Sequence, residues 1–216
     1  MRRTVITIGC LLALVGPNVA PLAAQDVVDG IAARVENEII LLSDVQVLSR
    51  YQQLVDGKAE SDKQILDRLV DQWIVRNEAD TAQFPRPSDD DVNHGVDRVQ
   101  QSFPSIAEYD ARKKQIGLSD GDVKRMVAAQ LYLNNYLDSR FRPSAKIEPK
   151  EVDEFYDKEV LTRAKARGQA PPSLDAARDY IREALVQKSI NEQAERWLNE
   201  SRGRVHVEKM PETGAP

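Results

Sequence analysis

The end of the chain carries one short segment, residues 204–207 (RVHV), in which polar and apolar side chains alternate after a long helical pattern. Such alternation predicts a β-strand. A single strand is not stable alone, because its backbone N–H and C=O groups need a partner ladder. The partner must therefore lie elsewhere in the sequence, and this requirement ties the end of the chain to a distant segment.

A hairpin near the start of the chain is the obvious partner. Ile31, Ala33 and Val35 alternate with small or charged residues, which is the period-two pattern of a half-buried strand. Asn37-Glu38 suits a two-residue turn because Asn tolerates positive φ, and residues 39–42 (IILL) supply the return strand. We therefore expect the C-terminal strand to complete a small sheet that an N-terminal hairpin begins.

Between these segments the sequence is a string of capped amphipathic helices. A serine precedes several of them, with acidic residues in the first turn that oppose the helix dipole: Ser43, Ser61, Ser88 and Ser119. Pro149 stands at a further helix start, and a last long helix runs from about residue 174 to residue 201 before a cap at Gly203. The predicted fold is therefore mainly α, a helical bundle with a small β element.

Residues 1–24 have the layout of a secretory signal peptide. Two arginines precede an apolar run that breaks at Gly16-Pro17, and small residues stand before Gln25. The run is too short to span a bilayer, although an N-terminal membrane anchor and a lipidated Cys10 are alternatives. Cleavage after residue 24 gives an exported chain that begins near Gln25 and lacks the only cysteine.

Composition argues against several classes of function. Loss of the leader changes the formal charge from −5 to about −7, which disfavours a nucleic-acid partner. His94 and His206 are the only histidines, so we expect no transition-metal site.

The acidic run 89–91 fits a helix dipole better than a cation site. The basic run 163–169 is typical of a solvated helix end, with a phosphate or lipid-headgroup site as the alternative. We expect no catalytic residue and no cofactor.

Four blocks of the sequence, taken in order, resemble the SurA-like periplasmic chaperones. They are VVDGIAARVENEIILLSDV, DRLVDQWIVRNEADTAQFPRPSDDDVNHGV, LSDGDVKRMVAAQLYLNNYL with KIEPKEVDEFYDK, and INEQAERWLNESRGRVHVEKM. The resemblance covers nearly all of the mature chain. It implies an N-terminal helical chaperone domain onto which the C-terminal helix and strand fold back.

One departure from the family pattern concerns catalysis. The relatives usually carry one or two parvulin-type prolyl isomerase domains of about 90 residues before the C-terminal helix. Here only EVLTRAKARGQA fills that position, which leaves no room for such a domain.

The expected organisation has five parts. A signal peptide at 1–24 is followed by a helical chaperone core with the hairpin at 25–142 and by a connecting helix and linker at 143–172, where the isomerase is absent. A C-terminal helix and strand at 173–210 and a disordered tail at 211–216 complete the chain.

The resemblance implies a holdase-type chaperone that binds unfolded or partly folded outer-membrane and envelope proteins, without an isomerase of its own and without stable membrane insertion. The alternatives are a prolyl isomerase or isomerase-associated subunit of the same family, and an envelope protein with one fixed partner. A helical cleft with aromatic walls would hold the alternating apolar strands of unfolded outer-membrane proteins. The candidate peptide-binding residues are Tyr51, Trp73, Met126, Tyr132 and Tyr136. Core packing is the competing interpretation for each of them, because large apolar side chains mostly bury.

Overall fold

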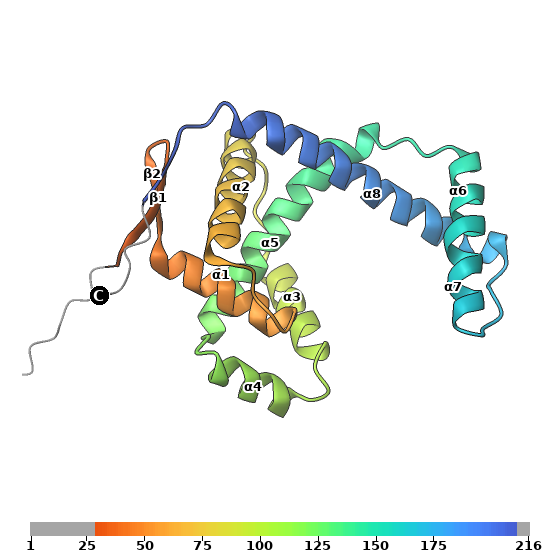
Figure 1. Ribbon diagram of the computed structural model, residues 1–216, viewed down its shortest axis with the longest axis horizontal. Helices are drawn as coiled ribbons and strands as arrows, with labels where there is room; N and C mark the ends of the chain where they lie inside the picture. The colour runs from red at the N-terminus through yellow and green to blue at the C-terminus, as the bar shows by residue number, and fades with distance from the viewer. Residues whose placement is uncertain (1–28, 211–216) are drawn as a thin grey trace, which may run out of the picture.

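The computed structural model describes residues 29–210, so the predicted signal peptide and the predicted C-terminal tail lie outside the described residues. The fold is mainly helical with a small sheet, as the sequence predicts. Figure 1 shows a helical body with the sheet on one side, and a smaller group of helices held away from the body by the longest helix. No helix in this part of the chain has the length and apolar character needed to cross a membrane.

The sheet joins the hairpin to the C-terminal segment. It contains β1 (Ile31–Val35), β2 (Glu38–Leu41) and β3 (Val207–Lys209) in the antiparallel order β2-β1-β3. Ala33 pairs with Lys209, and Val35 pairs with Val207. Beyond the ladder, Met210 N donates to Ala32 O at 3.0 Å. The predicted closure of the sheet is confirmed, with the strand beginning three residues later than expected.

The hairpin turn differs from the prediction by one residue. Val35 pairs directly with Glu38, so the turn is Glu36-Asn37 rather than Asn37-Glu38. Glu36 is the residue that adopts the positive φ, of 51°. Its carboxylate accepts a 2.7 Å hydrogen bond from His206 N, and its own N–H donates to His206 O at 3.0 Å. These bonds to the C-terminal segment compensate for the unfavourable backbone conformation.

The burial of β1 also departs from simple alternation. The pairing register shifts between Ile31 and Ala33, which places a bulge in β1. Ala32 is consequently 5% exposed, whereas Ile31 is 38% exposed. The period-two pattern of the sequence therefore predicts the strand but assigns the wrong side to its first two residues.

Five helices form the body: α1 (Leu42–Val55), α2 (Asp62–Thr81), α3 (Asp89–Gln101), α4 (Ile106–Gln115) and α5 (Asp120–Phe141). Ser61, Ser88 and Ser119 accept the expected capping bonds. Ser43 does not cap a helix, because α1 already begins at Leu42 and the carboxylate of Asp44 accepts from Leu41 N at 2.9 Å. The side chain of Ser43 instead donates to Asp29.

Three clusters of buried side chains hold the body together. The first lies between the sheet, α1 and α2, and the second lies between α1, α3, α4 and α5. The third joins α2 to α5, and Phe84 packs against it. Trp197 and Leu198 of α8 (Leu174–Arg202) pack against the first and third clusters, so the C-terminal half of α8 belongs to the body.

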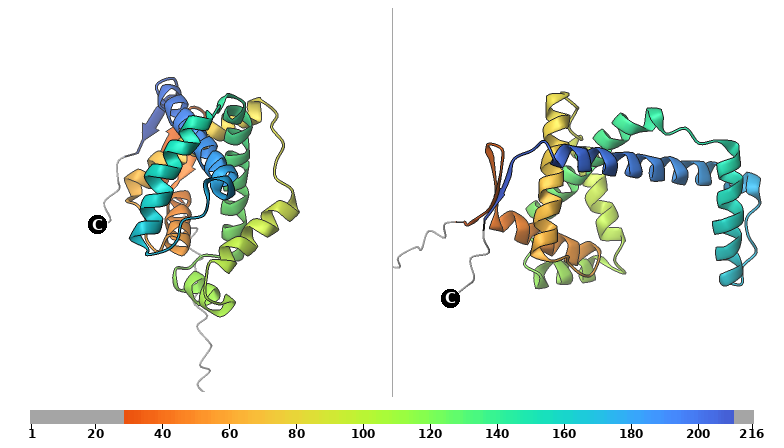
Figure 2. Two further views of the ribbon diagram at one scale, coloured as in Figure 1. Left: turned by 90° about the vertical axis from the view of Figure 1, so that its right-hand side faces the viewer. Right: turned by 45° about the horizontal axis from the view of Figure 1, so that its top comes forward.

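The N-terminal half of α8 leaves the body and carries a separate group of helices, which we call the distal lobe (residues 147–185). The 29 residues of α8 span about 43 Å. A second helical rod packs across its far end (Figure 2) and consists of α6 (Pro149–Phe155), a π-helical turn η2 (Tyr156–Val160) and α7 (Leu161–Ala166). The lobe has its own buried cluster, formed by Val152, Ala177 and Ile181.

A group of charged side chains spans the junction between body and lobe. A short 3-10 helix, η1 (Arg142–Ser144), follows α5. The Arg142 guanidinium donates to Glu183 at 2.7 Å and to Asp138 at 2.8 Å. These bonds hold the pKa of both carboxyl groups below its usual range, with Arg142 as the main cause in each case. Because Asp138 lies near the end of α5, Arg142 directly follows that helix in η1, and Glu183 lies on α8, the arginine joins α5 to α8 where the two helices diverge.

Candidate functional site

The predicted peptide-binding residues lie mainly in the core. Tyr51, Trp73, Tyr132 and Tyr136 are 7%, 7%, 2% and 5% exposed. Met126 is half-buried and packs against the first and second clusters. Side chains with so little exposed area offer almost no surface to a peptide, so the structure favours the competing interpretation, core packing, for all five.

The two tyrosines of α5 illustrate this structural role. Tyr132 Oη donates to Asp80 Oδ1 at 2.7 Å, and Arg86 lies 4.1 Å from the centre of the Tyr132 ring. Burial, reinforced by the hydrogen bond to Asp80, raises the pKa of Tyr132 above its ordinary value. Phe84 packs edge-on against Tyr136 with ring centres 5.5 Å apart. These contacts attach the segment after α2 to α5, and they serve packing rather than recognition.

An open cavity of about 330 Å³ lies in the distal lobe, between η2, α7, the linker after α7 and α8. Its apolar wall is made by Phe155, Val160, Pro172 and Ala184, with the ring of Tyr180 beside them. Tyr180 is 77% exposed, more than any other large hydrophobic residue that is exposed in this structure. The volume falls at the lower end of the range of ligand pockets, about 300–1,000 Å³, so the cavity suits one large side chain.

The π-helical turn builds this wall. Leu161 N donates to Tyr156 O, a bond that closes a turn of five residues. Phe155 and Val160 are five positions apart; in an α-helix they would point about 140° apart, but across a π-turn they lie on the same side. Tyr156 Oη donates to Pro172 O at 2.6 Å and holds the linker beside the rod. Because of the π-turn, residues from both ends of η2 face α8 together.

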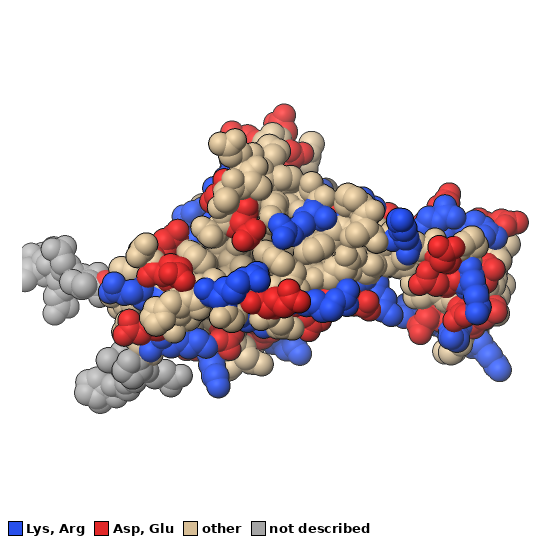
Figure 3. Space-filling model, turned by 90° about the horizontal axis from the view of Figure 1, so that it is seen from above, with Lys and Arg blue, Asp and Glu red and all other residues tan. Residues whose placement is uncertain are grey.

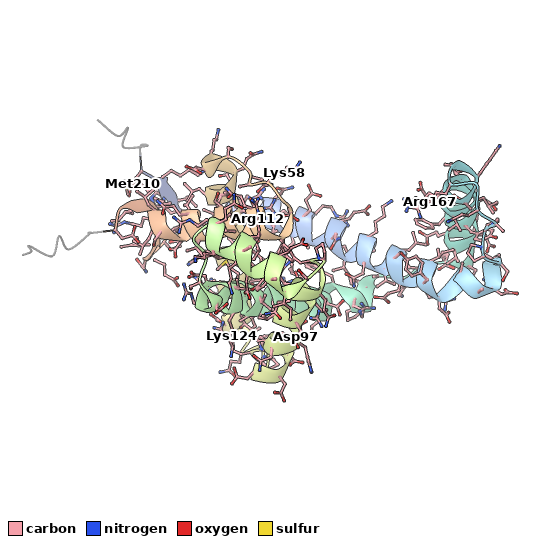
Figure 4. The ribbon with its side chains drawn as sticks, turned by 90° about the horizontal axis from the view of Figure 1, so that it is seen from below. Lys58, Asp97, Arg112, Lys124, Arg167 and Met210 are labelled. Carbon is pink, nitrogen blue, oxygen red and sulfur yellow. The ribbon has the colours of Figure 1, made fainter. Side chains whose placement is uncertain are left out.

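The charged side chains of the cavity are unevenly paired. Arg163 bonds to Glu159 at 3.0 Å. Arg167, labelled in Figure 4, also lines the cavity and makes no ion pair with any residue in the range 29–210. Charges of both signs are mixed over the lobe surface seen in Figure 3. The cavity itself therefore combines an apolar wall with one uncompensated positive charge, in a chain whose formal charge is −5.

A second, polar crevice of about 350 Å³ lies between α5 and α8. Its lining includes Asn134, Asn135 and Asp138 of α5, and Gln187 and Asn191 of α8. Gln187 Nε2 donates to Asp138 Oδ1 at 3.1 Å. In helical geometry, positions 180, 184, 187 and 191 share one side of α8. The apolar cavity and the amide-rich crevice therefore open along the same side of one helix.

The site residues predicted from the sequence do not include Tyr180, Arg163 or Arg167. The basic run 163–169 is predicted to be a solvated helix end, but two of its arginines line the cavity. One sequence signal could have identified Tyr180. It directly precedes Ile181, and neighbouring helix positions point about 100° apart, so the two side chains cannot both enter a narrow core.

The described residues hold no group of three or more His, Cys, Asp or Glu side chains arranged to bind a metal ion. His94 lies on α3, whereas His206 lies beside Glu36 next to the sheet. No protein-family model matches the chain, and a comparison with curated proteins finds no match. The resemblance to SurA-like chaperones therefore stays a prediction from the sequence.

Proposed function

We propose that this protein is a holdase-type chaperone of the bacterial envelope that binds unfolded or partly folded outer-membrane and other envelope proteins. The observation that carries the proposal is the open apolar cavity of the distal lobe, beside which Tyr180 is 77% exposed. A single exposed apolar side chain is common on protein surfaces. Here the ring of Tyr180 stands beside an open apolar cavity, and concave, mostly apolar cavities are where ligands bind.

The arrangement of the molecule supports a polypeptide as that partner. The distal lobe is joined to the body by the middle of α8 and by the segment that follows α5, so its sides face solvent (Figure 2). A long unfolded chain can therefore approach the lobe from solvent. A small cavity that takes one side chain selects weakly among sequences, which suits a protein with many clients.

The stretch 159–170, in which the chaperones that the sequence resembles carry an isomerase domain, holds here the end of η2, α7 and the start of the following linker. The proposal therefore includes no catalytic step. It extends the resemblance stated from the sequence, and the periplasmic location that it requires rests on the predicted signal peptide at residues 1–24.

The experiment is the dilution of a urea-unfolded outer-membrane β-barrel protein with and without the purified chain 25–216, with aggregation followed by light scattering. We expect suppression at near-stoichiometric amounts. A parallel assay of prolyl isomerisation in a peptide should show no acceleration. Unchanged aggregation at a several-fold excess of the chain would contradict the proposal, and accelerated isomerisation would replace the holdase with an enzyme.

A further inference from the structure

We infer that the distal cavity holds a client segment in which a large apolar side chain stands next to a carboxylate, with Arg167 as the group that binds the carboxylate. This inference rests on the proposed function, because it names the part of an unfolded chain that is bound. The chemistry required is an apolar group for the cavity and an anion for the arginine. An acidic side chain or the C-terminal carboxylate of the client supplies that anion equally well.

The charge of the cavity points to the carboxylate. Three charged side chains line it, namely Glu159, Arg163 and Arg167. The first two neutralise one another through their 3.0 Å bond. Arg167 has no ion-pair partner among the described residues, so its guanidinium donors are free to bind another group. A guanidinium binds a carboxylate through two parallel hydrogen bonds. A purely apolar client would leave this charge unused.

The apolar wall points to a large side chain next to that carboxylate. Phe155, Val160 and the ring of Tyr180 line the same cavity as Arg167. A residue that enters the cavity brings its neighbouring backbone, or the carboxylate at its own C-terminal end, close to the arginines that line the same cavity. Aromatic and branched side chains gain most from this contact, because the free energy of burial grows with apolar area.

The two ends of the described chain lie far from the cavity. Met210 lies beside β1, and Figure 4 shows Met210 and Arg167 at opposite ends of the molecule. From Arg202 back to Ala184 the distance along α8 alone is about 27 Å, and Met210 lies farther away on the sheet side. The occupant that we assign to the cavity is therefore a segment of a partner chain.

Fluorescence anisotropy with three dye-labelled peptides tests the inference on the intact chain 25–216. The probes are Gly-Ser-Gly-Ser-Phe with a free carboxylate, the same peptide amidated, and an amidated peptide that ends in Phe-Asp. We expect the amidated Phe peptide to bind about tenfold more weakly than the free acid, because a charge-assisted pair is lost. Binding of the Phe-Asp peptide at the level of the free acid would show that a side-chain carboxylate suffices.

Two variants and a matched control assign the effect to the cavity. Arg167→Gln should abolish the difference between acid and amide, and Tyr180→Ala should weaken all three probes. Arg112→Gln on α4, far from the lobe (Figure 4), should change nothing. Both altered side chains of the lobe are at the surface, and circular dichroism should show an unchanged fold.

The result that overturns the inference is equal binding of acid and amide by the unaltered chain, or an equal response to Arg167→Gln and Arg112→Gln. If this occurs while the chain still suppresses aggregation, the inference fails and the proposed function stands. If aggregation is not suppressed, the proposed function fails. A third outcome would also reject the inference. If no probe binds and the chain forms a concentration-dependent dimer that Tyr180→Ala disrupts, the cavity is assigned to a second copy of this chain.

Discussion

At the level of single residues, Gly95 sets how closely α3 approaches α5. A Cβ at this position would lie 2.5 Å from Val127 Cγ1 and 3.3 Å from Leu131 Cδ1. Gly95→Ala should therefore lower the free energy of unfolding by about 1–3 kcal/mol through overpacking, although alanine is the better helix former. Urea denaturation measures the change.

Gly121→Ala is the matched control, because a Cβ at Gly121 would meet its nearest neighbours at 3.7 Å, an ordinary contact distance. We expect no loss of stability there. Equal destabilisation by the two substitutions would show that close packing at Gly95 is not the cause.

A second prediction concerns Glu60 and pH. Its carboxylate accepts hydrogen bonds from Arg68 at 2.9 Å and from Gln52 at 3.0 Å, and these bonds lower its pKa from 4.5 to about 2. A carboxyl group with a lower pKa in the folded state stabilises the fold above its unfolded pKa, and this contribution is lost as pH falls. Stability from Glu60 should therefore be present at pH 7 and decline between about pH 4.5 and pH 2.

Glu60→Gln should lower the urea midpoint at pH 7 and flatten its decline across this acidic range. The matched control is Glu200→Gln, on the exposed surface of α8. If stability falls with pH to the same extent with and without the Glu60 carboxylate, the acid-induced loss does not come from Glu60. The effect is expected to be small because Glu60 is near the surface.

At the level of elements, β3 is expected to stabilise the whole sheet. Val205 and Val207 pack against the first cluster, and Lys209 pairs with Asp67 of α2. Removing residues from Arg204 onward should lower the free energy of unfolding by about 2 kcal/mol or more, since each valine loses burial and β1 loses a ladder partner. Thermal melts of the chain that lacks these residues measure the loss, and melts of the chain that ends at Met210 are the control. An unchanged transition in the shorter chain would contradict the closure role.

The π-turn gives a second prediction at this level. Deleting Asp157, an exposed residue of η2, leaves Phe155 and Val160 four positions apart, and four positions in an α-helix again lie on one side. Peptide binding should therefore survive the deletion. Inserting one alanine after Asp157 should instead turn α7 by about 100° relative to α6 and weaken binding. The same fluorescence anisotropy assay measures peptide binding by both variants. An equal loss of binding in the two would show that the π-turn does not determine the apolar wall of the cavity.

Particular elements show what the sequence could predict. The helix starts at Ser61, Ser88 and Ser119 followed from a local pattern, a capping serine before an acidic residue, and the structure confirms them. The pairing of β3 with the hairpin followed from the need of a lone strand for a partner. Ser43 has the same local pattern but bonds to Asp29 instead, since the preceding hairpin already starts α1 at Leu42.

The bulge in β1 and the π-turn in the distal lobe were not predicted, because each depends on a packing partner distant in sequence rather than on local propensity. The bulge is defined by the pairing with β2, and the π-turn packs against α8 and the linker. The candidate site was missed for the same reason. Aromatic residues at helical spacing predict a core. The position of Tyr180 next to Ile181 is a weak signal against this for one of the two residues, and the tertiary structure shows that Tyr180 is the one excluded from the core.

At the level of the whole molecule, the distal lobe is a separate unit of packing. Its buried cluster of Val152, Ala177 and Ile181 shares no buried residue with the three clusters of the body. Ile181→Ala, at a fully buried position, should cost about 2–5 kcal/mol, and the loss should be confined to the lobe. Hydrogen exchange should become faster in residues 147–185 and stay unchanged in α1–α4.

Ile190→Ala on the same helix is the control. Ile190 is 3% exposed and lines the crevice between α8 and α5, so its loss should accelerate exchange in the body instead. A uniform increase along the whole chain after Ile181→Ala would show that lobe and body unfold as one cooperative unit.

The pairing of β3 with β1 also determines the connectivity of the fold. Because Met210 N bonds to Ala32 O, the last described segment lies beside the first one. In terms of backbone path, the described chain is almost a ring, and its covalent gap lies at the sheet. The linker 167–173 lies at the opposite end of that ring, in the distal lobe (Figure 1). The position of the chain ends is thus nearly arbitrary for this architecture. A rearranged gene that joins the sheet strands and opens the linker encodes the same contacts, apart from those of the linker itself.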